Sequence, residues 1–516
     1  MMCISKGLAM LLISPTEHIG HTRPRLSYHP GYCLAIFAFC LVTLLSFTGI
    51  TVARPTKAQL RTPALQIYPA PDGIHASPDY TVTVNGKPVF VYDAKVQIER
   101  RNPQTHMGVC SFDFSKPVVV KVTANTSMQH VVIRPKARHI TPHINGNSIT
   151  LTLKKPCKLT IEPDGTGMTY SALALFANAP ETSVPNPTDP NVRYFGPGIH
   201  NVGQITLHNN ETVYLAGGAY VKGWLVGENV SNVRILGRGI LDRTVDDPKQ
   251  WPSFMWLNSC RNVTLDGITL MGGIRGWSVV PRESQDLVFH DVKLVCTGPN
   301  ADGFDICSCQ RVTIDDVFIR NWDDCVVLKA YKDIDTRDIT VKNSVLWIDL
   351  AQGLEIGYEL GCQKICNVRW DNIDIIHAYS NAAMSIHNSG HATVEDVMYN
   401  NIRVEDLDPA FGRTDIGHGP RLFDFWIGRS GYTKDGGQGK IRNITFNNIN
   451  VSTVGGVMPE SRITGFDAEH NIDGITFKNL CINNHVILDL TAANFLVAKQ
   501  GTDPEQNVRN IRFLKK

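Results

Sequence analysis

Residues 299–329 read PNADGFDICSCQRVTIDDVFIRNWDDCVVLK and contain one short pattern twice. In each copy an aspartate precedes an apolar run: Asp302 stands before residues 303–306, and Asp324 stands before residues 325–328. If the chain winds as a solenoid here, the two runs lie side by side in neighbouring coils. Strands in register stack about 4.8 Å apart, so Asp302, Asp323 and Asp324 would share one small patch.

The same phrase, a polar residue followed by alternating apolar positions, recurs along most of the chain. Its apolar anchors are Val233, Val263, Leu287, Val312, Ile339, Val368, Val397, Ile444, Ile475 and Ile511, and the first seven stand 24 to 30 residues apart. A period of this size indicates stacked structural units. Because each unit carries strands rather than helices, residues 190–516 are predicted to form a parallel β-helix. Leucine-rich repeats have a similar period, but their Leu-rich frame is absent.

Residues 63–183 have a different texture. Short alternating runs such as YTVTV at 80–84 and ITLTL at 149–153 are separated by Gly and Asn turns, which predicts an antiparallel β-sandwich. The proline-rich segment APETSVPNP at 179–187 then marks a linker. The whole chain is therefore expected to be all-β, with an N-terminal β-sandwich domain followed by the β-helix domain.

The apolar run YCLAIFAFCLVTLLSFTGITVA at 32–53 follows Arg23 and Arg25 and ends in small residues. This pattern predicts that residues 1–58 are a leader, either a signal peptide or a membrane anchor. We therefore expect an exported protein that is secreted, periplasmic or held at the cell surface.

The charge balance and the cysteine spacing indicate which partners and metals the protein is expected not to bind. The formal charge of the 516-residue chain is +2 and 19% of its residues are charged, which gives no support for nucleic-acid binding. Ten of the thirteen cysteines follow the leader, and none has the spacing of a zinc site. We expect no metal, no cofactor and a monomer. Cys362 and Cys366 are the candidate disulfide pair in an oxidising compartment.

Aligning residues 303–306 with 325–328, 353–356 and 383–386 gives a register for the coils. The inward row would be Phe304, Val326, Leu354 and Met384. The outward rows would be Asp305, Val327, Glu355 and Ser385, and then Cys307, Lys329, Gly357 and His387. Asp302, Asp324, Gln352 and Ala382 would share the bend before these strands. Outward rows on a β-helix line a groove, so the predicted substrate contacts are Asp305, Lys329, Gln352, Glu355 and His387.

Glycoside hydrolysis requires a cluster of this kind. One carboxylic acid protonates the leaving oxygen, and one or two carboxylates activate water. An aspartate before a strand is also ordinary turn chemistry, but its recurrence one coil apart favours a site. A groove of carboxylates with Lys and His suits a polysaccharide chain.

The motifs Asn300-Ala301-Asp302 and Asp323-Asp324 resemble the Asn-Thr-Asp and Asp-Asp motifs of glycoside hydrolase family 28, the polygalacturonase family. A β-sandwich ahead of a β-helix instead resembles family 49, the dextranases and isopullulanases. Both resemblances imply a right-handed, single-stranded parallel β-helix and hydrolysis with inversion, without a metal. Carried over, they make Asp323 the general acid and assign water activation to Asp302 and Asp324.

Two departures from family 28 bear on the substrate. Ala351-Gln352-Gly353 stands where the family has Gly-His-Gly, and Ser385-Ile386-His387 stands where it has Arg-Ile-Lys. The family's cationic clamp for a uronate is therefore missing, and arginine is hard to replace at a bidentate carboxylate site. A neutral polysaccharide or oligosaccharide is the expected substrate, in preference to polygalacturonate.

Two other functions remain open at this point. A β-helix polysaccharide lyase would use Ca²⁺ ligands with an Arg or Lys base, and its unsaturated product absorbs in the ultraviolet. A non-catalytic carbohydrate-binding β-helix would keep the aspartates as solvated turn residues, and no glycan would be turned over.

Overall fold

The repeat of the sequence becomes three rows of stacked strands in the computed structural model. The structure describes residues 63–97, 105–163, 172–244, 253–408, 419–433, 439–497 and 507–515. All of them belong to one compact unit, residues 61–516. The predicted leader at 1–58 lies outside the described residues, and the predicted domain boundaries stay a prediction.

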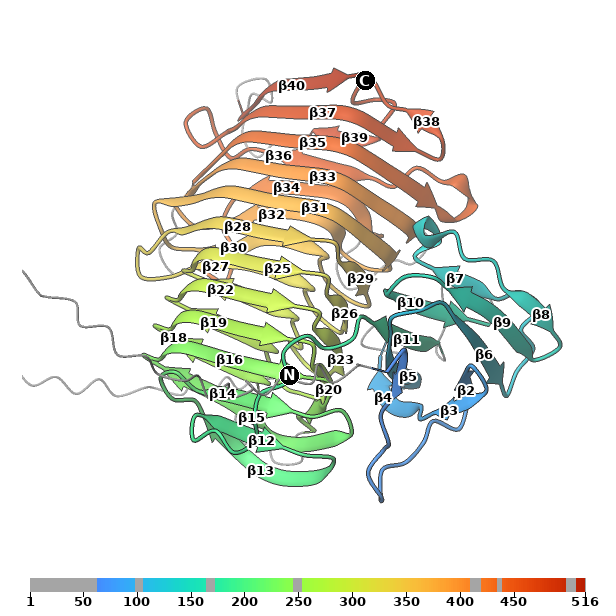
Figure 1. Cartoon of the computed structure of the whole chain (residues 1–516). Coiled ribbons are helices and arrows are strands. Elements are labelled where there is room, and N and C mark those ends of the chain that lie inside the picture. Colours follow the sequence, from blue (N-terminus) through green and yellow to red (C-terminus); the bar gives the residue numbers. More distant parts are fainter. Residues whose placement is uncertain are drawn as a thin grey trace, which may run out of the picture. The chain divides into compact units, whose positions relative to one another are not determined.

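The strands β12 to β40 form one 29-stranded sheet that winds as a right-handed parallel β-helix (Figure 1). The first row contains β12 (Val192–Phe195), β14 (Thr212–Leu215), β16 (Ser231–Gly237), β19 (Arg261–Asp266), β22 (Gln285–His290), β25 (Gln310–Asp315), β28 (Thr336–Lys342), β31 (Lys364–Ala378), β33 (Thr393–Leu407), β35 (Lys440–Thr453), β37 (Ile472–Ile482) and β40 (Val508–Leu514).

The second row begins with β13 (Gly198–Thr206) and β15 (Ala219–Glu228) and continues through β18 (Met255–Asn258), β21 (Val279–Arg282), β24 (Phe304–Cys307), β27 (Val326–Ala330), β30 (Leu354–Leu360), β32 (Ala382–Asn388), β34 (Arg421–Ile427), β36 (Ser461–Thr464) and β39 (Phe495–Val497). The third row contains β17 (Ile240–Asp242), β20 (Thr269–Gly273), β23 (Lys293–Thr297), β26 (Phe318–Asn321), β29 (Val345–Ile348) and the end of β31. A short strand, β38 (His485–Val486), pairs antiparallel with β37, and one 3-10 turn, η2 (Val454–Gly456), follows β35.

The predicted anchors form a single ladder along the first row. Val233 pairs with Val263, Val263 with Leu287, and the pairing continues without a slip to Ile475 and Ile511. The polar residue before an anchor makes a left-handed bend, as at Asn232 (φ 59°) and Asn262 (φ 53°), a conformation in which Asn and Asp are enriched. The Asn262 amide also donates to Asn232 Oδ1 at 2.8 Å. The recurring polar residue is therefore both the bend and a coil-to-coil contact.

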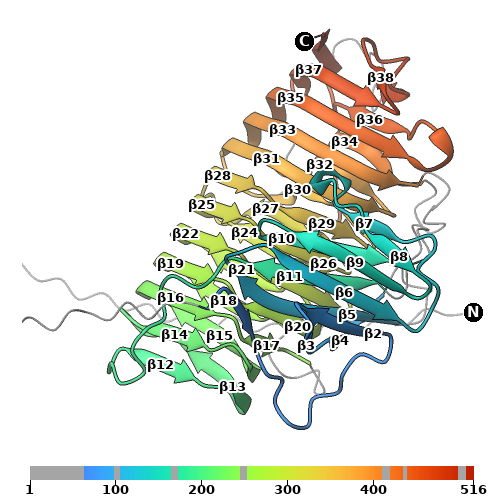
Figure 2. The ribbon, with the colours of Figure 1, turned by 45° about the vertical axis from the view of Figure 1, so that its right-hand side comes forward.

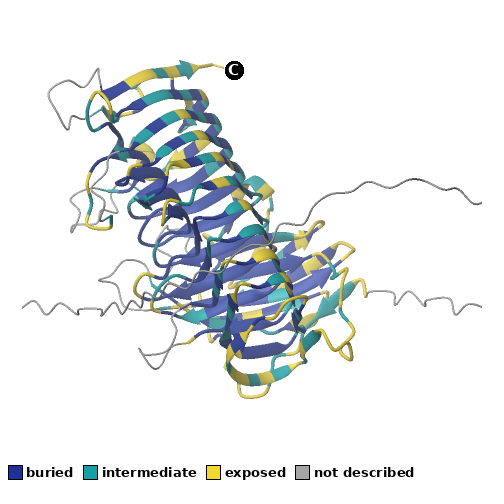
Figure 3. Ribbon diagram, turned by 90° about the vertical axis from the view of Figure 1, so that its left-hand side faces the viewer, coloured by how far each residue is buried: buried dark blue, intermediate teal, exposed yellow. Residues whose placement is uncertain are grey.

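The predicted inward row is confirmed. Phe304, Val326, Leu354 and Met384 pair in register through β24, β27, β30 and β32, and all four are fully buried. They belong to one apolar core that runs through the coils, whose inner positions are dark blue in Figure 3. Each coil thus buries its apolar side chains against the coils above and below it, which supplies the main stabilising term of a β-helix.

Two sheets precede the β-helix. The first contains β1 (Leu65–Ile67), β4 (Tyr92–Val96), β5 (Thr105–Phe114), β7 (Val132–Arg134), β10 (Cys157–Glu162) and β11 (Leu173–Asn178). The second contains β2 (Tyr80–Val84), β3 (Lys87–Val89), β6 (Val118–Ala124), β8 (His143–Asn145) and β9 (Ser148–Leu153), and a 3-10 turn, η1 (Lys136–Arg138), follows β7. Their facing side chains form a separate core. The sandwich is not wholly antiparallel as predicted, because β5 and β11 pair in parallel.

The first sheet of the sandwich is buried on both sides, because its outer face packs on the third row (Figure 2). Phe176 of β11 meets Phe318 of β26 edge to face at 5.1 Å between ring centroids. At the edge of this contact Arg134 pairs with Glu162 and Glu405, each at 3.1 Å. This double burial explains why every residue of β11 is buried where a half-exposed strand would alternate.

The candidate disulfide is absent. All ten cysteines in the described ranges are free thiols. Cys362 is buried and its thiol donates to the Lys364 carbonyl at 3.3 Å, so this prediction was wrong for the structure described.

Candidate active site

The three predicted acids lie in two neighbouring bends between the third and second rows. Asp302 comes directly before β24, and Asp323 and Asp324 come directly before β27. The Gly303 amide donates to the Asp324 carbonyl at 2.7 Å, and the Cys325 amide donates to the Gln352 carbonyl at 2.8 Å. These bonds stack the bends as the sequence predicted.

The amide of Asn321 at the end of β26 holds this corner. Its Nδ2 group donates to the carbonyls of Ala301, Asp323 and Asp324 at 2.7, 3.0 and 2.8 Å. A buried amide that satisfies three carbonyls of two coils fixes the bend that carries the acids. Sequence reasoning missed this residue, although its position just before the acidic pair was visible.

The bends open into a cavity of about 340 Å³. Its lining residues are Trp277, Asn300, Asp302, Asp323, Asp324, Lys329, Leu350, Ala351, Gln352, Gly357, Tyr358, Glu359, Asn381 and Tyr432. They come from successive coils, so the cavity runs along the axis of the β-helix, the direction that a chain of sugar units would follow. Asp302 and Asp324 are buried at its wall, while Asp323 is half-buried.

Lys329 lies among the acids, but its register differs from the prediction. Cys307 pairs with Lys329 and Gly357 pairs with His387, as expected. Between Leu328 and Ala330, however, the pairing of β27 with β30 shifts. An irregularity of this kind re-aims a side chain. The Lys329 ammonium lies 3.0 Å from Asp305 Oδ1 and 3.6 Å from Asp302 Oδ2.

Burial and mutual repulsion perturb the acids. Burial raises the pKa of Asp302, with the Asp305 charge adding to the effect, and raises the pKa of Asp305 to about 6. Burial also raises the pKa of Asp324, and the Asp323 charge adds to it. The Lys329 charge lowers all three pKa values but does not cancel the effect. Burial and the neighbouring charges therefore favour the protonated forms of these carboxyl groups, and Lys329 favours their ionised forms.

Three of the predicted substrate contacts lie behind the cavity wall. Asp305, Glu355 and His387 are no more than 1% exposed and do not line the cavity. Glu355 accepts from His387 Nδ1 at 2.9 Å and also from Ser385 Oγ. The outward row is thus covered, and Tyr358 covers His387 directly, with ring centroids 4.5 Å apart and an angle of 14° between the planes. Lys329 and Gln352 do reach the cavity wall.

The segment of the chain that forms most of this cavity matches a known protein family. Residues 195–410 match the family model of glycosyl hydrolases family 28. The predicted resemblance to family 28 is confirmed over this segment. Apart from Tyr432, every residue that lines the cavity lies inside the family 28 segment.

Curated relatives overlap the family 28 segment only in part of their length. A probable endo-xylogalacturonan hydrolase A from Aspergillus fumigatus is 24% identical over 189 residues, which is 34% of this chain and 45% of the relative. A protein of the same description from Neosartorya fischeri is 27% identical over 173 residues, 31% of this chain and 41% of the relative. The chain thus matches less than half the length of these relatives.

A solved structure extends the likeness beyond the family 28 segment. Dex49A from Penicillium minioluteum superposes with a TM-score of 0.56 at 17% identity, over 87% of this chain and 96% of that one. The shared property at this identity is the fold. The predicted family 49-like arrangement, a sandwich ahead of the β-helix, is confirmed at that level.

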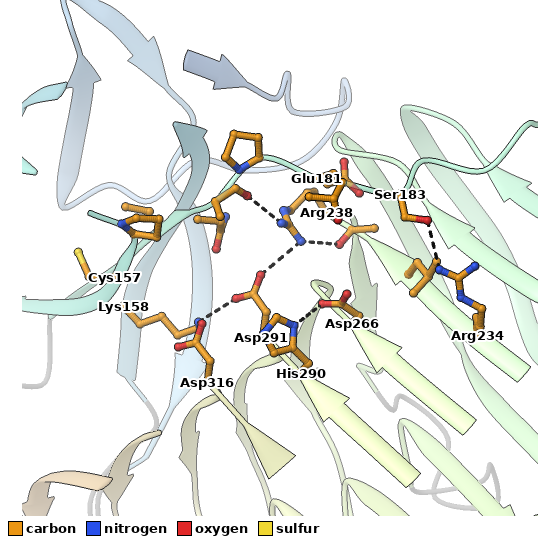
Figure 4. Close-up of a pocket in the computed structure, with 18 residues that line it drawn as sticks. Cys157, Lys158, Glu181, Ser183, Arg234, Arg238, Asp266, His290, Asp291 and Asp316 are labelled. Atoms are coloured by element: carbon orange, nitrogen blue, oxygen red, sulfur yellow. Dashed lines mark hydrogen bonds and ion pairs between the residues drawn. The ribbon is translucent and has the colours of Figure 1, made fainter. Parts of the chain in front are cut away.

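A second cavity, of about 250 Å³, lies where the sandwich, the linker and the β-helix meet (Figure 4). Arg238 at its centre pairs with Asp113 at 3.1 Å and with Asp291 at 3.3 Å. Lys158 of the sandwich bridges Asp291 and Asp316, both at 2.8 Å. Because these charges satisfy one another, the cluster holds the sandwich on the β-helix rather than presenting free groups to a ligand.

Sequence reasoning missed further residues that line this cavity. Asn300 lies in the same bend as Asp302, Asn381 comes from a later coil, and Tyr432 reaches the cavity from the segment after β34. The loop that carries Tyr432 interrupts the repeat, so no period points to it. Within the described ranges, no group of three or more His, Cys, Asp or Glu residues is arranged to hold a metal ion.

Proposed function

We propose that this protein is a glycoside hydrolase that cleaves O-glycosidic bonds of a polysaccharide or oligosaccharide with inversion. The observation that carries the proposal is the cluster of Asp302, Asp323 and Asp324 on the wall of one elongated cavity within the family 28 segment. Asp323, the most exposed of the three, protonates the leaving oxygen. Asp302 and Asp324 activate the water on the opposite side of the sugar, about 6.5–9.5 Å from the acid.

A neutral sugar is the proposed substrate class. The cations beside the cavity are engaged by the protein's own carboxylates: Lys329 pairs with Asp302, Asp305 and Glu359. Arg421 pairs with Asp424 and Glu460 at 3.2 and 2.7 Å. A uronate would therefore meet a wall of carboxylates, and like charges at short range repel. The names of the Aspergillus and Neosartorya relatives make xylogalacturonan the competing substrate.

The test is turnover of a substrate panel by the wild type and two variants. The panel contains dextran and other neutral glucans, polygalacturonate and xylogalacturonan. Asp323→Asn should lower kcat by about 10²–10⁴-fold, because the amide keeps the shape but cannot donate the proton. Asp333→Asn is the matched control, since its side chain is 63% exposed and lies away from the cavity.

Three results would contradict the proposal. Efficient release of galacturonic acid from polygalacturonate would refute the neutral substrate. A first-formed product with the substrate's own anomeric configuration in proton NMR would refute inversion. An unsaturated product that absorbs in the ultraviolet would indicate a lyase instead.

We also propose that residues 1–58 direct export and that the protein acts as a monomer. The apolar run at 32–53 supports the first point. No helix in the described part of the chain is long and apolar enough to span a membrane. N-terminal sequencing of protein recovered outside the cytoplasm and its mass in solution test both points; cytoplasmic retention with an intact N-terminus would contradict export.

A further inference from the structure

Three carboxylates and one indole ring surround the Lys329 ammonium group. Its three carboxylate neighbours lie at 3.0 Å (Asp305), 3.6 Å (Asp302) and 3.8 Å (Glu359). The ring of Trp277 covers it, with Nζ 3.6 Å from the centroid. The side chain is only 6% exposed. An ammonium group has three donors, and three carboxylates already surround it.

We propose that Lys329 is a positioning residue, which holds the carboxylates of Asp302 and Asp305 in place and favours their ionised forms, and that it does not bind the sugar. This inference rests on the proposed function, because it takes Asp302 as one of the groups that activate water. It replaces the direct sugar contact that the sequence alone suggested for Lys329.

The charges around Lys329 predict the direction in which Lys329 shifts the pKa of Asp302. Asp302 faces Asp305, Asp323 and Asp324 as well as Lys329, and Asp305 also faces Glu359. Cys307 also acts on Lys329, and Tyr331 is acted on by Cys307, Glu359, Lys329 and Asp305. Lys329 is the one cation among five carboxyl groups in this described cluster. Every neighbouring acid makes Asp302 harder to ionise, and Lys329 alone acts in the opposite direction.

Trp277 strengthens this arrangement. An ammonium over an indole face gains electrostatic attraction that grows when water is excluded. Trp277 and Lys329 both line the cavity, but the indole covers one side of the ammonium and three carboxylates surround it. A sugar at this wall therefore meets an ammonium whose charge is already paired.

The first experiment needs no substrate. Carboxyl protonation in the resting protein is followed by difference infrared spectroscopy during a pH titration, and the band lost in Asp302→Asn assigns Asp302. Lys329→Met should move the Asp302 transition upward by about 1–3 pH units, because it removes the adjacent positive charge. Glu359→Gln should move it downward, because it removes a negative charge. Lys332→Met, whose side chain is 67% exposed, is the matched control and should leave it unchanged.

Opposite shifts from the two charge changes support the proposal, since loss of packing alone would not produce opposite signs. Shifts of the same sign, or none from Lys329→Met, overturn it. If Lys329→Met does not fold, the double variant Lys329→Met/Asp305→Asn removes the ammonium together with its nearest carboxylate, 3.0 Å away. Its Asp302 transition is compared with that of Asp305→Asn alone, so that only Lys329 differs; equal transitions in these two variants likewise overturn the proposal.

The second experiment uses the neutral glucan that the wild type hydrolyses. Lys329→Met should shift the acidic limb of the kcat profile to higher pH by the same amount, with KM changed less than about twofold. A large rise in KM with an unshifted limb would mean that Lys329 binds the sugar, which overturns the inference and leaves the hydrolase proposal standing. Absence of turnover on the whole panel would defeat the proposed function, while the infrared result would still decide the role of Lys329.

Discussion

At the scale of single residues, the site works through charges that the fold holds out of water. Asp302 and Asp324 are buried and stacked in adjacent bends, and their pKa values are raised chiefly for that reason. For His387, neighbouring charges rather than burial determine the direction of the pKa shift. Burial alone would lower its pKa, but the carboxylates of Glu355 and Asp424 outweigh burial and raise the pKa to about 10. Burial therefore favours the protonated form of the acids at the cavity wall, while paired carboxylates favour the protonated, charged form of His387 behind it.

The raised pKa of His387 predicts a pH dependence of stability. A group whose pKa is higher folded than unfolded contributes stability that is full below the unfolded pKa, about 6.5, and is lost as pH rises through the folded value of about 10. Urea unfolding of the wild type and His387→Gln should therefore differ most at pH 6 and least above pH 10. His106→Gln is the control, because that side chain is 48% exposed. A difference that grows with pH would contradict the assignment.

At the scale of elements, the stacked strands supply both the core and the alignment of the site. Phe304, Val326 and Leu354 occupy one inward column, and the residues just before their strands carry the acids. A shift in one strand of this column would therefore move a catalytic bend as well as a core side chain. The shift between Leu328 and Ala330 occurs beyond the column, where β30 has the extra residues and Gly357 no longer pairs with Lys329, but the acids stay in register.

Leu354→Ala should reveal how much one position of the column contributes. The side chain is fully buried, and deleting a buried leucine side chain costs about 2–5 kcal/mol because a cavity remains. The free energy of unfolding from urea denaturation measures the loss. Val288→Ala on the first row is the matched control: its side chain is 40% exposed, so its effect should stay within about 0.5 kcal/mol. Equal losses of unfolding free energy in the two variants would mean that this buried column contributes no more to stability than the half-exposed position does.

At the scale of the whole described unit, the sandwich packs on the third row of the β-helix, next to the candidate site. The sandwich covers β20, β23, β26 and β29, the strands that lead into the catalytic bends. Arg134 joins the two parts, since it pairs with Glu162 of the sandwich and with Glu405 and Asp406 of the β-helix. His377 lies 3.0 Å from Glu162 and 2.7 Å from Asp406.

Arg134→Met should loosen this interface. Removing one partner of a buried charge cluster costs about 3–5 kcal/mol, because the carboxylates left behind are unpaired. Hydrogen exchange should then accelerate in β7 and β10, and kcat should fall if the bends behind the site relax. Arg138→Met is the control from the neighbouring turn, with a 36% exposed side chain 3.7 Å from Asp374. Unchanged exchange in β7 and β10 would show that apolar packing alone holds the sandwich in place.

What the sequence by itself determined is the part of this protein that repeats. The anchors from Val233 to Ile511, the Asn and Asp bends, and the stacking of Asp302, Asp324 and Gln352 all follow from the two-residue period of a strand and the coil period. That information is local, because each coil pairs only with its neighbours. The clustering of Asp302, Asp323 and Asp324 was predictable for the same reason, since these residues lie one coil apart.

Only the tertiary structure decided which polar groups face the substrate. A register shift in β30 breaks the predicted pairing of Lys329 with Gly357, Tyr358 covers His387, and the segment after β34 brings Tyr432 to the cavity. The docking of the sandwich likewise converts an expected half-exposed sheet into one buried on both faces. These features depend on contacts between segments far apart in the chain, where no period relates one residue to the other.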